Sequence, residues 1–346
     1  MMVGIHEAEY GRYGFERFQT YRQILEYNQI PYIDLHIDQP DFWERVKECD
    51  VFIYRWSQID RHRQIAQTIL PIIENELKIK CFPNQKTCWH FDDKIKQYFL
   101  LKQYDFPITE SFVFYKKKDA LEWLDRASFP IVFKLYGGAG SLNVSLAKTK
   151  REVRKLIKRM FGRGIKPGAI PIGNVRFHSL KTYFRKTLGP LYYRYITGET
   201  DDWNKHKGYV LFQKYLPGNN FDTRVTIIGS RAFAFRRMNR KNDFRSSGSG
   251  LIDYDRREIS LEMVKMAFEI CKKLEFQTMA FDFLYNENKI EFCEISYSYD
   301  DKAIQRCTGY WDSELSWHEG HFWPQYCHLV DLLGITLKQP EINLYD

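Results

Sequence analysis

The stretch MAFDFLYNENKIEFCEIS constrains the fold of this chain more than any other part of it. Residues Phe281 to Tyr285 and Lys289 to Ser296 have the composition of buried strands, and the polar turn residues between them favour a hairpin. A hairpin centred near Asn288 places Asp282 directly opposite Glu294. Two carboxylates that face each other among apolar residues, about 5 Å apart, require a positive partner or a metal.

Oxygen donors are the feature that Asp282, Glu294 and Ser296 share. Ser296 lies two residues beyond Glu294, so it points to the same face of the strand. Mg²⁺ prefers oxygen ligands, usually takes one or two carboxylates, and completes its shell with water and phosphate. The spacing therefore favours a magnesium site, although a surface hairpin with solvated acids fits the spacing equally well.

The composition limits the classes of protein to consider. A chain of 346 residues with 44% hydrophobic residues is long enough for two or three packed units. No apolar run approaches the roughly 20 residues of a membrane span, and the start lacks a signal-peptide pattern, so we expect a cytoplasmic protein. The seven cysteines are scattered without CxxC spacing, which argues against disulfides and zinc. The net charge of +8 favours anionic ligands such as nucleotides, phosphorylated sugars, lipid or nucleic acid.

Residues 1–85 alternate between strand and helix patterns, which predicts an open parallel sheet covered by helices. No GxGxxG motif follows the first strand, so a dinucleotide site there is improbable. Glu7, Tyr10 and Arg12 follow the carboxyl end of that strand, where open α/β sheets bind ligands. An ordinary polar loop is the commoner explanation for such residues.

Two lysines and a glycine-rich turn mark the middle of the chain. Lys94 stands near the start of an amphipathic helix, against the helix dipole, which suggests an anionic ligand. Lys134 stands near the end of a buried strand and is followed by GGAGS at residues 137–141. Glycines in such a turn let backbone N–H groups approach an anion, although a flexible turn is the commoner case. Thr149 and Glu152 then form a capping box for a helix.

The segment 162–207 carries interleaved basic and aromatic residues without a sustained period. This pattern fits nucleic-acid binding, but we favour a lid or a docking surface for another anionic partner. Strands follow at residues 209–215, 223–229 and 231–238, and a helix at residues 261–274. Asp222, just before the second of these strands, and Arg224 within it alternate onto one face. Arginine is suited to a bidentate grip on phosphate or carboxylate, although surface arginines on exposed strands are the commoner case.

From Lys94 to Ser298, the order of these features resembles the ATP-grasp family, and in particular the ribosomal-protein glutamate ligases, glutathione synthetases and D-alanine ligases. The resemblance rests on joint order, because no single element is specific. The family pattern is read here as Lys94, Lys134, GGAGS at 137–141, LFQKYLPG at 211–218, Asp222 with Arg224, Arg237, DFRSSGSG at 243–250, Asp282, Glu294 and Ser296.

The resemblance implies an α/β (α+β) architecture, the ATP-grasp fold. An N-terminal open parallel α/β domain over residues 1–85 would precede two α+β subdomains that clamp ATP. The first of these, residues 86–207, would hold the linker helix, the glycine-rich lid and the basic aromatic insertion. The second, residues 208–346, would hold the metal site and an aromatic C-terminal tail.

The resemblance also implies roles for individual residues. The residues expected to bind ATP are Lys94, Lys134, Gly137, Gly138, Gly140, Ser141, Gln213, Lys214, Tyr215, Leu216 and Asp222. Two Mg²⁺ ions, for which Mn²⁺ can substitute, would be bound by Asp282, Glu294 and Ser296. The catalytic residues would be Arg237, Lys134 and Arg245, and the substrate-binding residues Arg224, Arg245, Ser246 and Ser247.

Two positions depart from the family pattern. Lys214 stands where relatives often carry an acid that contacts the nucleotide, and Ser296 replaces the usual asparagine, which puts the second metal in doubt. The tail contains Trp311, Trp317 and Trp323, which would suit either a wall for a sugar or a plain core. His318 and His321 in HEGH lack the HExxH spacing of a zinc protease.

The expected activity is ATP-dependent ligation of a carboxylate to an amine through an acyl phosphate. The substrates would be a small-molecule carboxylate and a small-molecule amine. If they are linked to a sugar, the enzyme would act in the assembly of surface polysaccharide. The alternatives are a kinase that phosphorylates a hydroxyl, and a nucleic-acid-binding protein with a degenerate site. The intact Asp282, Glu294, Lys134 and Arg237 argue against the second alternative. A homodimer is the oligomeric state considered for this chain.

Overall fold

The computed structural model describes residues 1–6, 12–56, 60–138, 143–167, 204–241 and 243–342. The chain forms two compact units. The larger unit comprises residues 1–57, 62–109 and 216–346, and the smaller unit comprises residues 58–61 and 110–215. The three-part division at residues 85 and 207 stays a prediction.

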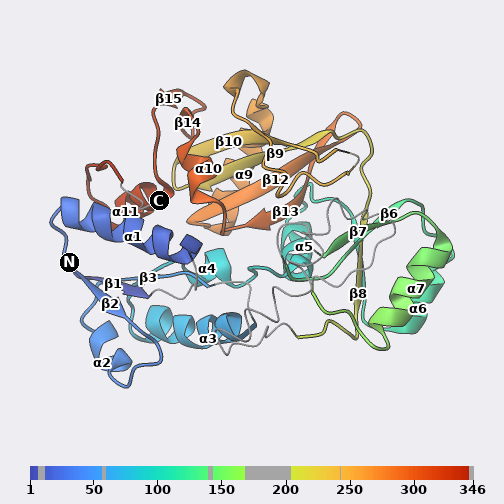
Figure 1. Ribbon diagram of the computed structural model, residues 1–346, viewed down its shortest axis with the longest axis horizontal. Coiled ribbons are helices and arrows are strands. Elements are labelled where there is room, and N and C mark those ends of the chain that lie inside the picture. The colour runs from blue at the N-terminus through green and yellow to red at the C-terminus, as the bar shows by residue number, and fades with distance from the viewer. Residues whose placement is uncertain (7–11, 57–59, 139–142, 168–203, 242, 343–346) are drawn as a thin grey trace, which may run out of the picture. The chain divides into compact units, whose positions relative to one another are not determined.

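The N-terminal part of the larger unit contains a parallel four-stranded sheet, as expected from its alternating pattern. Along the sheet the strands are β2 (Tyr32–Leu35), β1 (Val3–His6), β3 (Val51–Tyr54) and β4 (Lys80–Phe82). Helices cover both faces (Figure 1). They are α1 (Arg12–Tyr27), α2 (Phe42–Val46), α3 (Asp60–Pro71) with its π-helical continuation Ile72–Glu76, and α11 (Pro324–Leu333).

Successive side chains of the parallel strands point to opposite faces of the sheet, and both faces are apolar, so helices pack on both. Val3 and Ile5 pack with Phe18 of α1 and Leu329 of α11. On the other face, Phe52 belongs to the cluster that contains residues of α2 and α3. Two short helices, α4 (Gln85–Cys88) and α5 (Lys94–Gln103), follow the last strand.

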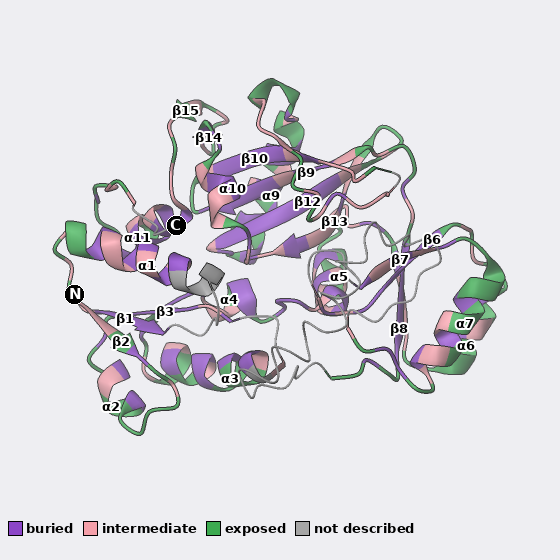
Figure 2. Ribbon diagram, viewed as in Figure 1, coloured by how far each residue is buried: buried purple, intermediate pink, exposed green. Residues whose placement is uncertain are grey.

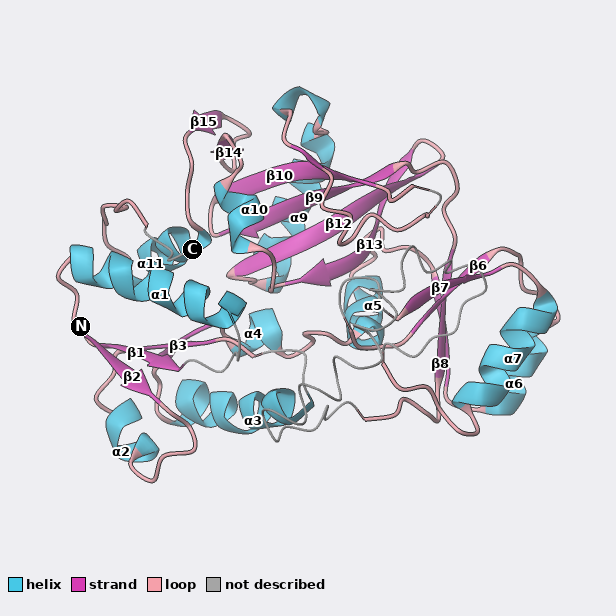
Figure 3. Ribbon diagram, in the orientation of Figure 1, coloured by secondary structure: helices cyan, strands magenta, loops and turns pink. Residues whose placement is uncertain are grey.

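A seven-stranded antiparallel sheet forms the rest of the larger unit (Figure 3). The strand order is β13 (Lys289–Ser296), β12 (Thr278–Asn286), β9 (Phe221–Ile228), β10 (Arg231–Met238), β14 (Gly309–Trp311) and β15 (Trp317–Glu319), with β11 (Ile252–Asp253) paired to β10. The 3₁₀ turn Arg256–Glu258 leads to α9 (Leu261–Leu274), and α10 (Asp301–Gln305) follows β13.

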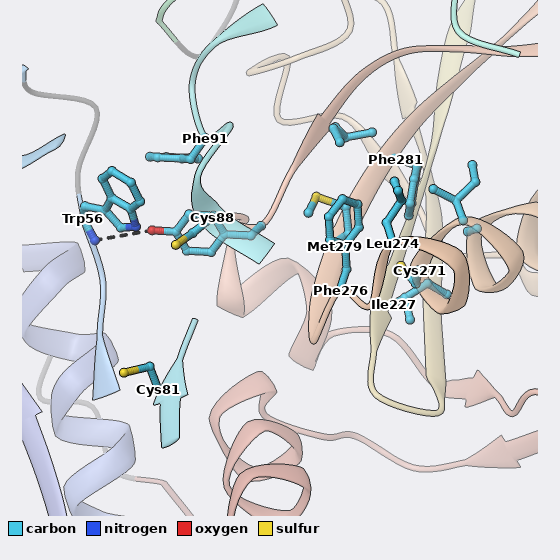
Figure 4. Close-up of a cluster of buried hydrophobic side chains, with 14 of the residues drawn as sticks. Trp56, Cys81, Cys88, Phe91, Ile227, Cys271, Leu274, Phe276, Met279 and Phe281 are labelled. Atoms are coloured by element: carbon cyan, nitrogen blue, oxygen red, sulfur yellow. Dashed lines mark hydrogen bonds between the residues drawn. The ribbon is translucent and has the colours of Figure 1, made fainter. Parts of the chain in front are cut away.

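The two faces of this sheet differ in what covers them. Figure 4 shows Met279 and Phe281 of β12 and Ile227 of β9 gathered with Leu274 and Cys271 of α9. The opposite face packs against α10 and α11 over part of its length. The strands β9, β10 and β12 are largely buried (Figure 2), which is why their polar residues are informative.

The smaller unit is built on an antiparallel sheet in the order β5 (Ser111–Phe114), β8 (Val210–Lys214), β6 (Ile131–Lys134) and β7 (Val144–Ala147). Its helices are α6 (Lys117–Leu124) and α7 (Lys150–Met160). The predicted capping box of α7 is confirmed, with Thr149 and Glu152 bonded reciprocally. Trp123 of α6 packs against Phe112, Phe114 and Phe212, so these aromatic residues define the helical face of the sheet.

Candidate functional site

The structure brings the predicted acids of the larger unit into a row of charges across four strands. Asp282 lies directly opposite Glu294 on β13, as predicted, and opposite Arg224 on β9. Asp222 of β9 lies opposite Arg237 of β10. All five residues lie on the face away from α9, because along their strands they alternate with the positions of the apolar cluster beneath that helix, namely Val225, Ala234, Phe281 and Ile295.

A β-bulge sets the pairing of the two acids. The hairpin closes with Asn286 opposite Lys289, and Phe283 faces Phe292. That register alone would place Cys293 opposite Asp282 and would turn Glu294 toward the apolar face. The ladder shifts by one residue between Asp282 and Phe283, which leaves Cys293 as the extra residue and brings Glu294 into the row.

Salt bridges compensate the charges within the row. Arg224 grips both oxygens of Asp282, with Nε to Oδ1 at 2.7 Å and Nη2 to Oδ2 at 2.9 Å. Arg237 does the same to Asp222 at 2.7 and 2.6 Å, and its Nη2 also lies 2.7 Å from Asp282 Oδ2. The side chains of Arg237, Asp222 and Asp282 are only 8, 9 and 8% exposed. Such bidentate, desolvated pairs are the strong class of ion pair.

Lys94 extends the row from the linker helix. Asp93 caps α5 by accepting from the backbone N–H groups of Ile95 and Lys96, which fixes Lys94 in the first turn. The Lys94 side chain is 7% exposed, and its Nζ lies 3.1 Å from Glu294 Oε1. Its position against the helix dipole is therefore matched by an acid from another element.

The pKa shifts follow from burial and these contacts. Burial would raise the pKa of Asp282, but Arg224 and Arg237 outweigh it and hold that pKa well below its usual value. Burial raises the pKa of Asp222, and Arg237 works against that shift. Burial would lower the pKa of Lys94, but Glu294 and Asp92 outweigh it and raise that pKa. Asp282 and Lys94 are therefore charged at neutral pH.

The donor set fits Mg²⁺ in chemical type. Asp282 and Glu294 offer carboxylate oxygens from opposed positions, and the Glu294 side chain is 32% exposed. Within the described residues, no group of three or more His, Cys, Asp and Glu side chains is arranged to hold a metal. Mg²⁺ usually takes one or two carboxylates and completes its shell with water and phosphate. The Ser296 hydroxyl donates to the Ser298 carbonyl oxygen at 2.7 Å and accepts from its N–H. Its role as a metal ligand stays a prediction.

In the smaller unit, Lys134 and Gln213 share the sheet face opposite the aromatic helical face. Lys134 pairs with Leu211, and Gln213 pairs with Val132, so the alternation places both side chains on one side. Both are buried. Gln213 Nε2 donates to Ser111 Oγ at 3.2 Å, which fixes the end of its side chain.

The glycine-rich turn begins with a constrained backbone. Gly138 has φ of +105°, and a Cβ added there would lie 2.0 Å from Asn143 Nδ2. That same amide donates to the Gly137 carbonyl oxygen at 3.0 Å. Glycine is therefore required at position 138 by both conformation and space. The predicted Gly140 and Ser141 lie outside the described residues, as do Glu7, Tyr10 and the side chain of Arg12.

The predicted hinge and substrate loop lie at the ends of β8 and β10. Lys214 is exposed and Tyr215 half-buried, whereas Leu216 is buried. In the loop, Arg245 grips Asp243 bidentately at 2.6 to 3.0 Å. Ser246 Oγ donates to Asn239, and Arg240 donates to the Ser247 carbonyl oxygen. These contacts order the loop internally, and the substrate roles of Arg245, Ser246 and Ser247 stay predictions.

The aromatic tail divides between core and surface. Trp311 is buried and meets Trp317 edge-on, with the ring centroids 4.6 Å apart, and Arg256 covers the Trp317 ring. His318 bonds to Asp312, and His321 bonds to the Gln305 carbonyl oxygen. Trp311 and Trp317 thus have structural partners, whereas Trp323 lines a pocket.

This pocket, which the sequence analysis missed, has a volume of about 210 Å³ and lies in the larger unit. Charged residues from three parts of the chain line this pocket. They are Glu16 and Arg17 of α1, Arg55 just after β3, Asp300 just before α10, and Asp301 and Lys302 of α10. Arg55 also reaches the Ser298 hydroxyl, two residues beyond Ser296. These residues are far apart in sequence and follow no motif. The one sequence feature that could have indicated the pocket is the position of Arg55 just past the carboxyl end of a parallel strand, where open α/β sheets bind ligands.

No family model matches this sequence, and no curated protein matches it. Solved structures do match. A carboxyaminoimidazole ribonucleotide synthase from Aspergillus clavatus, complexed with ATP, is 10% identical with a TM-score of 0.57, covering 98% of this chain and 78% of that one. The ATP-grasp ligase PsnB, complexed with a minimal precursor, is 13% identical with a TM-score of 0.55, covering 96% and 98%.

A D-alanine–D-alanine ligase from Bacillus anthracis, complexed with ATP, is 14% identical with a TM-score of 0.53, covering 86% of each chain. The structure thus defines an α/β protein with paired carboxylates on an antiparallel sheet, and the chain has the ATP-grasp fold. The predicted fold is confirmed. Among the described helices, none is long and apolar enough to cross a membrane.

Proposed function

We propose that this protein is an ATP-dependent carboxylate–amine ligase. The γ-phosphoryl group of ATP would pass to a carboxylate oxygen, which gives an acyl phosphate and ADP. An amine would then attack the acyl carbon, and inorganic phosphate would leave as the amide forms. The observation that carries the proposal is the charge row, in which Asp282 faces Glu294 and the two are contacted by Arg224, Arg237 and Lys94.

The row is suited to a polyphosphate because its cations are already buried and oriented. Arg237 is held by Asp222 and Asp282, so it needs no reordering to meet an anion. We propose that Arg237 and Lys94 contact phosphate oxygens and that Asp282 and Glu294 hold Mg²⁺. When bound, Mg²⁺ would neutralise the charge that develops on the transferring phosphoryl group.

The smaller unit supplies the second set of groups. We propose that Lys134 and the backbone N–H groups of the turn at Gly137 and Gly138 bind phosphate, and that the chain from Gln213 to Leu216 binds the adenine. Buried Lys134 and the forced backbone at Gly138 support this assignment. A closed turn of this kind would also exclude water from an acyl phosphate.

The acceptor proposal rests on the pocket next to Ser298. Its volume of about 210 Å³ lies below the roughly 300–1,000 Å³ typical of sites for drug-sized ligands, which suits a single amino acid or one sugar ring rather than a nucleotide-linked sugar. Trp323 in its lining supplies an aromatic surface for such a ring. A role in surface polysaccharide assembly, a cytoplasmic location and a homodimer remain finer parts of the proposal.

The decisive experiment is Mg²⁺-dependent ADP release, measured with carboxylates crossed against amines and with product masses recorded. Turnover that needs both partners, with loss of water in the product mass, would establish the ligase. Turnover with one hydroxyl partner and a gained phosphate would make the protein a kinase. Salt-sensitive RNA or DNA binding without ATP turnover would favour the degenerate-site alternative.

Glu294→Gln tests the row directly. The amide keeps the size of the side chain but removes the charge that Mg²⁺ and Lys94 require, so we expect turnover to be lost while the circular dichroism spectrum stays native. Glu291→Gln on the same strand is the matched control, because Gln can still accept the hydrogen bond from Asn286. Full activity in Glu294→Gln would remove the metal role.

A further inference from the structure

Four buried side chains from separate elements form one line of hydrogen bonds in the larger unit. Tyr21 Oη of α1 lies 2.8 Å from His328 Nδ1 of α11, and His328 Nε2 lies 2.8 Å from Tyr299 Oη. Tyr299 Oη lies 2.6 Å from Thr278 Oγ1 of β12. All four residues are buried, so their hydrogen-bonding groups must satisfy one another.

The donor of each hydrogen bond in this line can be assigned by starting from Thr278. Thr278 Oγ1 donates its one proton to the Ile227 carbonyl oxygen at 2.8 Å. Tyr299 must therefore donate to Thr278, which leaves its oxygen to accept from His328 Nε2–H. A neutral imidazole carries one N–H, so Nδ1 is an acceptor and Tyr21 donates to it.

The surroundings of His328 favour the neutral ring. Its two nitrogens meet tyrosine hydroxyls rather than carboxylates, and the Phe82 ring packs with its centroid 4.2 Å from that of the imidazole. Burial, together with the nearby Arg17 and Arg231, lowers the pKa of His328 well below its usual value.

Tyr299 is held at both ends. Its hydroxyl belongs to the line of hydrogen bonds, and its carbonyl oxygen accepts from Arg17 Nη2 at 3.1 Å. The residues after it continue the attachment to α1, because Arg17 Nε lies 2.6 Å from Asp301 and Lys302 Nζ lies 3.0 Å from Glu16. These residues are the charged wall of the pocket described above.

We propose that His328 is the positioning residue of this pocket: a neutral imidazole, protonated on Nε2, that fixes Tyr299 and so holds the wall from Tyr299 to Lys302 against α1. The assignment of the pocket to the acceptor rests on the proposed function. The state of the imidazole and the anchoring of the wall do not, so they are tested without a substrate.

The first test is the tautomer of His328 in the full chain labelled with ¹⁵N-histidine. Long-range ¹H–¹⁵N spectra of the native protein and of His328→Gln assign the ring by difference. We expect a protonated Nε2 and an unprotonated Nδ1 at neutral pH. A proton on Nδ1, or on both nitrogens, would overturn the proposal.

The second test is hydrogen exchange of the peptide that covers residues 299–304, followed by mass spectrometry. His328→Leu removes both hydrogen bonds, so we expect faster exchange in this peptide than in the rest of the unit. His328→Gln places an amide nitrogen near the position of Nε2 and should restore part of the protection. Leu329→Ala removes a buried side chain from the same helix and is the matched control.

Equal acceleration of this peptide by His328→Leu and Leu329→Ala would show that His328 only packs, and would overturn the proposal. Tyr299→Phe removes one hydroxyl and little volume, so it gives the same test if His328→Leu fails to fold. In the ligase assay, His328→Gln should raise the KM for the acceptor and leave the KM for ATP unchanged. Absence of acceptor turnover in the native protein would instead count against the proposed function.

Discussion

Arg237 lies within salt-bridge distance of two buried carboxylates, and this arrangement makes it the residue on which the charge row depends most. Asp222 and Asp282 are each less than one-tenth exposed, so neither can be solvated if the guanidinium is removed. Desolvating a charge is costly, and the pairing recovers that cost only while both partners are present. The row is therefore better explained by function than by stability.

We expect Arg237→Met to destabilise the protein by about 3 to 5 kcal/mol, because it leaves two buried acids with one fewer cation. The double variant Arg237→Met/Asp222→Asn should recover part of this loss, since it also removes the negative charge of one of the two buried carboxylates. Urea unfolding followed by tryptophan fluorescence measures both.

Arg257→Met is the matched control for this prediction. Arg257 also grips an aspartate bidentately, but its side chain is 83% exposed, so its loss should leave the unfolding midpoint unchanged. Equal destabilisation by Arg237→Met and Arg257→Met would contradict the importance assigned to burial.

At the scale of elements, two short irregularities decide where functional groups point. The bulge at Cys293 turns Glu294 to the charged face, and the positive φ of Gly138 starts the glycine-rich turn. The sequence analysis predicted the opposition of Asp282 and Glu294 from a hairpin centred near Asn288. This opposition is confirmed. The turn residues are Glu287 and Asn288, so the hairpin is centred half a residue before Asn288, and the bulge shifts the register so that Glu294 lies opposite Asp282.

Gly138→Ala should weaken ATP binding, because the new Cβ would displace the Asn143 amide that closes the turn and the backbone would be strained. We expect the KM for ATP to rise at least tenfold. Gly208→Ala in the same unit is the control, because Gly208 also has positive φ, at +81°, but a Cβ added there would meet no atom within 4 Å. A rise of equal size in both variants would assign the effect to backbone strain alone.

At the scale of the whole molecule, buried histidines should make stability depend on pH. Burial lowers the pKa of His6 from 6.5 to about 4 and that of His90 to about 3. Between 6.5 and about 4, the unfolded chain binds protons that folded His6 and His90 do not. The free energy of unfolding should therefore fall as the pH falls through this window, by about 1.4 kcal/mol per pH unit for each group.

Urea unfolding at a series of pH values across this window measures the slope. His6→Asn keeps a donor to the Leu35 carbonyl oxygen and cannot be protonated, so we expect a shallower slope. The same change at exposed His321 is the control and should leave the slope as it is. An unchanged slope in His6→Asn would show that His6 is not a source of the acid sensitivity.

Local periodicity was enough to predict several parts of this protein from its amino-acid sequence. Strand alternation, the capping box of Thr149 and Glu152, and the spacing of Asp282 and Glu294 each follow from neighbouring residues. The order of the motifs from Lys94 to Ser296 carried the family resemblance that predicted the ATP-grasp fold. The charge partners, the bulge and the pocket depend instead on contacts between elements that are distant in sequence. Lys94 meets Glu294, and His328 meets Tyr21 and Tyr299, across separations that no local pattern encodes, because packing brings those elements together.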